Sequence, residues 1–281
     1  MPGRARHDTV GGRDRVGRHD RVDRQEADYS VPRAMLHERM RFTRLSFDIL
    51  DNYMAMVRAA ATDVDYAAAV AAGERGLAAR EALTARNPTY TTYKKIGENG
   101  YSWWPGEVQQ YLELLPLTDG SVGKLVAKTP LVWSFKRDPD NRGAEEGWAA
   151  ALPAPTENVR TDLYLQAQGV MDGGLQGYNG WGWYSTQVEL TGADLAAPGR
   201  TLHLGFPGLF NVAMLYVNGQ AVATRQLNSA RWWDNDYRFE WGVDVSPYLK
   251  QGMNRFTLRI HNPHHLGGIF RRPFLYSRPA S

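Results

Sequence analysis

The sequence contains no cysteine among its 281 residues, and it has no long apolar run. The absence of cysteine excludes disulfide frameworks, thiolate metal sites and cysteine nucleophiles. No stretch approaches the roughly 20 apolar residues that span a bilayer, so we expect no membrane partner. Residues 1–25 also lack the apolar run of a secretory signal, and nothing in them directs export. The sequence leaves the compartment undetermined.

A large excess of one charge is also missing, because the sequence contains 33 Lys and Arg residues and 30 Asp and Glu residues. Much of the basic character lies in residues 1–30, which alternate Arg, Asp, His and Gly. This segment has almost no apolar side chains, so burial cannot offset the entropy lost when a chain becomes ordered, and we predict that it is disordered. Acidic residues interrupt the basic ones throughout, which argues against a nucleic-acid partner. A nucleic-acid arm and a stretch without any role are the alternatives.

Residues 31–122 are predicted to form an α-helical region with an aromatic connector. Apolar residues recur there at spacings of three, four or seven, which is typical of one helix face. They are Leu36, Met40, Phe47, Leu50, Met54 and Val57. Asp65 is placed to cap a second, alanine-rich helix that ends before Asn87, and a short helix is expected near residues 106–112. Because a helical hairpin cannot bury such wide faces by itself, the rest of the chain or a domain absent from it must cover them.

Helical spacing stops near Leu125, and short β-branched and aromatic runs then alternate with turn residues. About nine strands without helical crossovers predict a mainly β domain, an antiparallel β-sandwich of the jelly-roll type, over residues 123–281. The clearest local signal is Asn218-Gly219, which suits a type I′ hairpin turn. The predicted strands are 131–136, 161–166, 181–190, 201–206, 212–217, 220–226, 237–243, 254–261 and 269–276.

Four segments of this domain, in order, resemble a known family. Residues 180–184 look like the strand with a Trp-Tyr-Arg pattern in the sugar-binding jelly roll of β-galactosidase and β-glucuronidase relatives. Residues 216–219 are similar to the central hairpin of that domain, 243–262 to its long turn and strand, and 267–273 to its Gly-Gly-Ile-aromatic-Arg-Pro segment. The resemblance implies a galactose-binding-like domain of a glycoside-hydrolase-like protein.

The resemblance also has departures and an extension. Ser185 stands where the family usually has Arg, and an extra Arg271 precedes Arg272-Pro273. Residues 38–143 look like the tail of large bacterial proteins that combine a glycosidase-like barrel, helices and a terminal jelly roll. A catalytic barrel absent from this chain is therefore an expected partner.

Aromatic and polar residues in the loops of the sandwich are the candidate carbohydrate contacts. Loops of a jelly roll gather at its ends, where an indole ring with neighbouring amides and carboxylates can hold a sugar. Trp183, by contrast, is expected in the core. The candidate residues are Tyr178, Asn179, Trp181, Trp232, Trp233, Asp234, Asn235 and Arg271.

Catalytic, metal and cofactor sites receive less support. A glycosidase needs two carboxyl groups across a cleft. The candidates Glu98, Glu107, Glu145, Glu146, Asp234, Asp236 and Glu240 show no such pairing in the sequence. A calcium loop starting at Asp138 would have Ala149 at its twelfth position, which removes the bidentate ligand. The group His261, His264 and His265 could gather a metal but is more typical of a loop. We expect no cofactor, no metal and no catalytic residue.

Three functions from different classes remain. The first is a non-catalytic, carbohydrate-binding accessory module. The second is a structural module that only packs against a catalytic barrel, and an exposed apolar helix face that recruits a partner would favour it. The third is a self-contained glycosidase. Which sugar is bound and the oligomeric state do not follow from the sequence.

Overall fold

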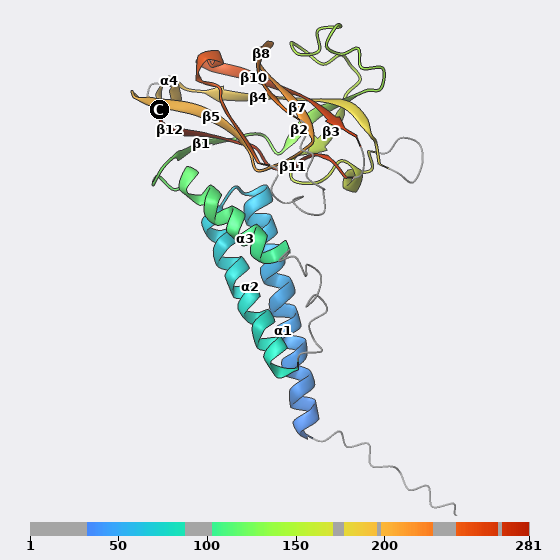
Figure 1. Cartoon of the computed structure of the whole chain (residues 1–281), viewed down its shortest axis with the longest axis vertical. Coiled ribbons are helices and arrows are strands. Elements are labelled where there is room, and N and C mark those ends of the chain that lie inside the picture. The colour runs from blue at the N-terminus through green and yellow to red at the C-terminus, as the bar shows by residue number, and fades with distance from the viewer. Residues whose placement is uncertain are drawn as a thin grey trace, which may run out of the picture. The chain divides into compact units, whose positions relative to one another are not determined.

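A computed structural model describes residues 33–87, 103–170, 177–195, 198–226, 240–263 and 266–280. The chain divides into two compact units, Met1–Arg41 and Phe42–Ser281. In the first unit the described residues form the beginning of helix α1, which runs over Arg33–Val57, and its Met35, Leu36 and Met40 side chains are exposed. The second unit contains the other helices and all of the described strands (Figure 1).

Three helices of the second unit pack on one another. Helix α1 continues into a π-helical turn η1 (Arg58–Thr62), followed by α2 (Tyr66–Arg86), α3 (Trp103–Leu114) and the short η3 (Leu115–Leu117). The Asp65 carboxylate accepts a hydrogen bond from the Ala68 N–H at 2.9 Å, so the predicted cap of the second helix is confirmed. On α2, a Cβ atom at Gly73 or Gly76 would lie within 2.4 Å of Val108 or Trp104. Glycine therefore allows α2 and α3 to approach closely.

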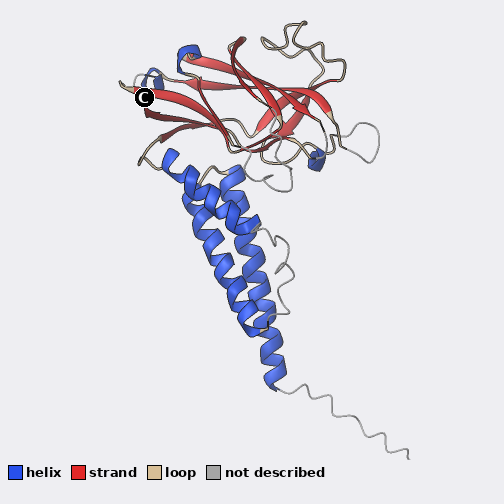
Figure 2. Ribbon diagram, viewed as in Figure 1, coloured by secondary structure: helices blue, strands red, loops and turns tan. Residues whose placement is uncertain are grey.

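The strands form antiparallel sheets, drawn in red in Figure 2. A four-stranded sheet has the order β1-β12-β5-β9, a six-stranded sheet has the order β3-β2-β4-β10-β7-β8, and β11 pairs with β6. The bounds are β1 Lys124–Lys128, β2 Val132–Asp138, β3 Glu157–Arg160, β4 Gly180–Leu190, β5 Arg200–Phe206, β6 Gly208–Phe210, β7 Val212–Val217, β8 Gln220–Arg225, β9 Trp241–Asp244, β10 Gly252–Asn262, β11 Gly268–Arg271 and β12 Phe274–Pro279. Short helical turns are η4 (Gln166–Gln168), α4 (Gly192–Leu195) and η5 (Ser246–Tyr248).

The sandwich core is formed by alternate side chains of both larger sheets. Tyr184 on β4 and Leu258 on β10 belong to the same buried cluster as Leu204 on β5 and Leu275 on β12. At the predicted hairpin, Asn218 and Gly219 have φ values of 53° and 83°, as a type I′ turn requires. The expected fold, an antiparallel β-sandwich preceded by helices, is confirmed.

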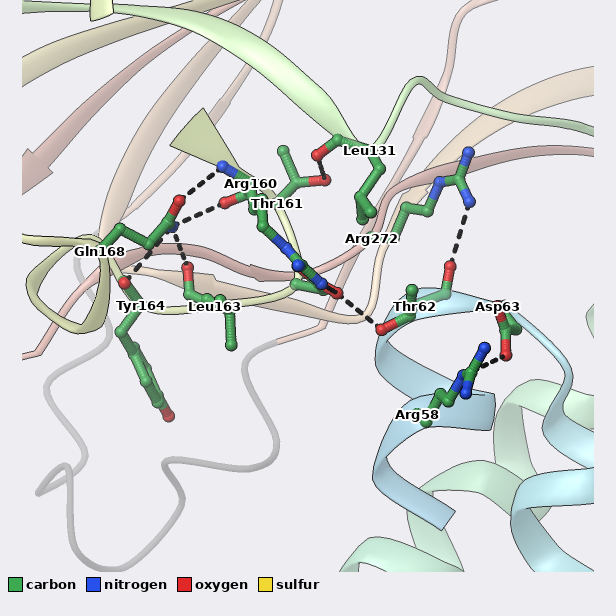
Figure 3. A network of polar contacts seen from close by, with 11 residues as sticks. Arg58, Thr62, Asp63, Leu131, Arg160, Thr161, Leu163, Tyr164, Gln168 and Arg272 are labelled. Carbon is green, nitrogen blue, oxygen red and sulfur yellow. Dashed lines mark hydrogen bonds and ion pairs between the residues drawn. The ribbon is translucent and has the colours of Figure 1, made fainter. Parts of the chain in front are cut away.

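Two predicted strands differ from the structure. Residues 161–166 form a turn and the start of η4 instead, because the Gln168 side chain binds both the N–H and the carbonyl of Arg160, at 2.6 and 2.9 Å, and curls the chain (Figure 3). The strand in this region, β3, lies earlier. The predicted strand 269–276 is interrupted at Pro273, which has no N–H for a ladder, and gives β11 and β12. The first three residues of the predicted strand 237–243 lie outside the described residues.

The helices meet the sandwich through a polar joint, shown in Figure 3. Thr62 at the end of η1 donates a hydrogen bond to Asp162 at 2.6 Å, and the Arg272 guanidinium donates to the Thr62 carbonyl at 3.1 Å. Burial opposes ionisation of Asp162, but hydrogen bonds from Arg160 and Thr62 hold the pKa of this carboxyl below its ordinary value. Beside the joint, Phe274 and Tyr276 of β12 complete the helical core, so the sandwich covers part of the helical faces.

Within the described ranges, no helix combines the length and the apolar character needed to cross a bilayer.

Candidate functional site

The six-stranded sheet is covered on both faces. Alternation along β4 and β10 points Tyr184 and Leu258 into the sandwich, and it points Trp183 and Arg259 to the opposite side. The strand register sets Trp183 beside Arg259 and Arg259 beside Met214 of β7. We call this side the outer face, and its main residues are Trp181, Trp183, Met214, Tyr216, Arg259 and His261.

Arg259 is the central residue of the outer face. Only 8% of it is exposed, and its Cζ atom lies 3.9 Å from the ring centroid of Trp181 and 5.6 Å from that of Trp183. The guanidinium donates to the Met214 sulfur at 3.4 Å and to the Asn141 side-chain oxygen. Its Nε atom is buried and has no hydrogen-bond partner among the described residues. A buried charge with a spare donor is costly, which favours a role other than packing.

Asp138, at the end of β2, fixes the loop that reaches Arg259. One carboxylate oxygen accepts hydrogen bonds from the Trp183 indole at 2.8 Å and from the Gly143 N–H at 3.0 Å. The other oxygen accepts from the Arg142 N–H at 2.8 Å. Both carboxylate oxygens of Asp138, the first residue of the calcium loop considered above, thus accept hydrogen bonds from N–H groups. The loop carries Asn141 to Arg259, and it carries Trp148 to within 6.2 Å of the Trp183 ring.

A groove of about 290 Å³ continues the outer face toward the sheet edge. Residues of β7 and β8 line it, including Met214, Tyr216, Ala221 and Thr224. The Tyr216 ring stacks on Trp183 with a centroid distance of 5.6 Å and an interplanar angle of 27°. The groove thus shares Met214 and Tyr216 with the outer face.

Trp181 is the predicted carbohydrate contact that lies on the outer face. It is half-buried, and its ring centroid lies 4.7 Å from that of His261. Burial and, to a smaller extent, the charge of Arg259 lower the pKa of His261 below its ordinary value. The imidazole is thus neutral at neutral pH, when its nitrogens can both donate and accept hydrogen bonds.

Tyr178 and Asn179 precede Trp181 but lie largely inside the protein. The buried Tyr178 hydroxyl donates to the Trp181 carbonyl at 2.5 Å, and burial raises its pKa. The Asn179 amide donates to the Gly177 carbonyl at 3.1 Å, while its oxygen is buried without a partner among the described residues. A cavity of about 10 Å³ beside Tyr178 has the size of a single water molecule. Sugar contact by these two residues stays a prediction.

Arg271 lies at the contact between the sandwich and α3. Its guanidinium is buried and binds Glu107 at 3.1 Å and Gln110 at 2.8 Å. Burial by itself opposes the charge, but Tyr111 and Glu107 raise the pKa of Arg271 above its ordinary value. A sugar contact by Arg271 would have to displace these partners, and it stays a prediction. The other predicted contacts, Trp232, Trp233, Asp234 and Asn235, lie outside the described residues.

Two of the candidate carboxylates have partners of their own. Glu107 is paired with Arg271, and Glu146 accepts from the indole of Trp148 at 3.2 Å and pairs with Arg142. Glu98, Asp234, Asp236, His264 and His265 lie outside the described residues. Within the described part of the chain, no group of three or more acidic or histidine side chains could hold a metal ion.

Sequence reasoning missed Arg259, Asn141 and the structural role of Asp138. A usable signal was present, because Thr257, Arg259 and His261 alternate along one predicted strand and Trp181 and Trp183 alternate along another. Two such strands pair side by side only if these polar and aromatic residues share a face.

Comparison with known proteins gives similarity to solved structures only. No protein-family model matches the sequence. No curated protein matches it either. The β-glucuronidase of Ruminococcus gnavus is similar over 56% of this chain and 29% of its own, with 19% identity and a TM-score of 0.46. Its complex with D-glucuronic acid gives 18% identity, the same TM-score and coverage of 30% of that chain. This chain thus spans less than a third of those proteins, and a likeness of this strength does not identify an activity.

Proposed function

We propose that this chain is a non-catalytic carbohydrate-binding module, the accessory part of a glycoside-hydrolase-like protein, and that the outer face of the six-stranded sheet is its binding surface. The observation that carries the proposal is the half-buried Trp181 ring, whose centroid lies 3.9 Å from the Arg259 Cζ atom on the sheet face that also contributes Met214 and Tyr216 to the groove.

The chemistry of this surface suits a sugar. A sugar ring offers C–H faces to indole and phenol rings and hydroxyl groups to nearby polar side chains. Trp181 and Tyr216 supply the rings, and His261 and Arg259 supply donors beside them. The Asp138 carboxylate accepts hydrogen bonds from the covering loop and from the Trp183 indole and holds both in place. Because little has to be ordered on binding, such a surface loses little entropy when it takes a ligand.

The test compares Trp181→Ala with Trp241→Ala in the full chain. Trp241 is also partly exposed, but it stacks on Phe206 in the other sheet. Loss of Trp181 should weaken binding to a recognised glycan by about tenfold, equivalent to about 1.4 kcal/mol, whereas loss of Trp241 should leave binding unchanged. The measurement is the dissociation constant from isothermal titration, with thermal unfolding as a check that both variants fold.

A glycan array that includes neutral and uronate-bearing oligosaccharides identifies the ligand for that titration. Tighter and salt-sensitive binding of the acidic glycans would assign Arg259 a direct electrostatic role. If the native chain binds no glycan, the proposal is wrong, and the structural module that packs on a barrel becomes the better hypothesis. Hydrolysis of nitrophenyl glycosides by the chain would contradict its non-catalytic assignment.

A further inference from the structure

Within the second unit, helix α1 is apolar on two different sides. Ile49, Tyr53 and Met56 pack into the helical core. Phe47, Leu50 and Met54 are exposed to 59%, 53% and 58%. Successive residues of a helix are about 100° apart, so the mean directions of these two sets differ by roughly 125°. A helix that covers one core normally has a single apolar stripe, so the second stripe indicates another partner.

The spacing of the exposed side chains indicates what kind of partner fits. Thr43, Phe47, Leu50 and Met54 follow one another at intervals of four, three and four residues, and in the sequence the same alternation reaches back to Met40 and Leu36. This is a heptad pattern, with a mean period of 3.5 residues. Such a narrow seam packs against one other helix, whereas a broad sheet or barrel surface would favour a wider stripe.

The charges beside the seam favour a second copy of this chain in the antiparallel direction. If Phe47 and Met54 occupy heptad position a and Leu50 occupies position d, then Arg44 and Asp51 both occupy position e. In an antiparallel pair of identical helices, position e faces position e of the other copy. Arg44 then faces Asp51 of the second copy, and symmetry creates the same pair again.

A parallel pair lacks this match. Position e would then face position g, which sets Arg44 against Arg39 of the second copy, and two like charges would repel. Within its own helix Arg44 has only an exposed contact with Asp48, at 4.0 Å, which a partner could replace at little cost. We propose that two copies of this chain associate through an antiparallel pairing of their α1 helices along Thr43, Phe47, Leu50 and Met54.

The first test is sedimentation velocity of the full chain over a concentration series. We expect a dimer that dissociates on dilution. Met54→Glu should weaken the dimer by at least about tenfold because it places a charge in the seam. The matched control is Met253→Glu, an equally drastic change at a methionine on β10 that is 49% exposed, and it should leave the dimer intact. Far-UV circular dichroism checks that both variants keep their helices.

A chain that is monomeric at every concentration would overturn the proposal, as would a dimer that Met54→Glu leaves unchanged. Coverage of the stripe by another segment of the chain, or by a different protein, would also give a monomer in this assay.

The second test determines the direction of the pairing, and the absence of cysteine makes it simple. In the antiparallel arrangement Thr43 lies opposite Met54 of the other copy. The double variant Thr43→Cys/Met54→Cys should therefore form an interchain disulfide under mild oxidation, while Met54→Cys alone should not. Efficient cross-linking of the single variant, or none of the double variant, would contradict the antiparallel pairing.

Discussion

The two faces of the six-stranded sheet are buried in different ways. The inner face carries apolar side chains such as Tyr184, Leu258 and Ile260, which pack against the second sheet. The outer face buries Asp138, Trp183 and Arg259 under a loop and joins them by hydrogen bonds and cation–π contacts. The inner face is stabilised by apolar area and close packing, whereas the outer face depends on specific polar partners. The difference teaches that burial alone does not separate core from site; the chemistry of the buried groups does.

The largest effect is expected on the inner face. Leu258→Ala removes a fully buried side chain between the sheets and should lower the free energy of unfolding by about 2–5 kcal/mol. Urea denaturation measures this loss, and Leu266→Ala, at an exposed leucine, is the matched control with an expected change within about 0.5 kcal/mol. Equal effects of the two substitutions would remove the basis for the contrast between the faces.

A smaller effect is expected from the outer face. Asp138→Ala leaves the Trp183 indole and two backbone N–H groups without their acceptor, which should lower the free energy of unfolding by about 1–3 kcal/mol. It should also weaken any ligand binding, because the loop that carries Asn141 to Arg259 would no longer be held in place. The control is Asp140→Ala, an exposed acid two residues away. If urea denaturation gives the two variants the same stability, the loop is not held by Asp138.

The smallest effect is a pH dependence confined to the outer face. The pKa of His261 in the folded chain lies below its ordinary value, about 6.5, because of burial and the charge of Arg259. Above that pH the imidazole is neutral in both states and adds no pH dependence. As the pH falls below about 6.5, the unfolded chain takes up the proton first, so stability decreases.

The variant His261→Gln should therefore lose stability less steeply than the native chain as the pH falls from 7 to 5, as measured by thermal unfolding. His203 in the other sheet, whose pKa burial also lowers, keeps its own contribution in both proteins. An unchanged slope in the variant would show that His261 titrates as in the unfolded chain.

Sequence reasoning predicted the elements whose signals are local. The cap at Asp65, the turn at Asn218-Gly219 and the alternation along β4 and β10 depend on residues a few positions apart. The site was harder to predict because its contacts join distant segments. Asp138 meets Trp183 across 45 positions, and Asn141 meets Arg259 across 118. Trp183 was expected to be buried and is, but a loop on the outer face covers it, not the second sheet.

Strand β12 has one further consequence. Phe274 and Tyr276 belong to the core of the helices, while Leu275 between them belongs to the core of the sandwich. A single strand thus supplies alternate residues to two cores. We therefore expect the helices and the sandwich to unfold together, on both sides of the predicted boundary near residue 123. Evolution could exchange the loops of this protein more easily than it could transfer its sandwich, without the helices, to another chain.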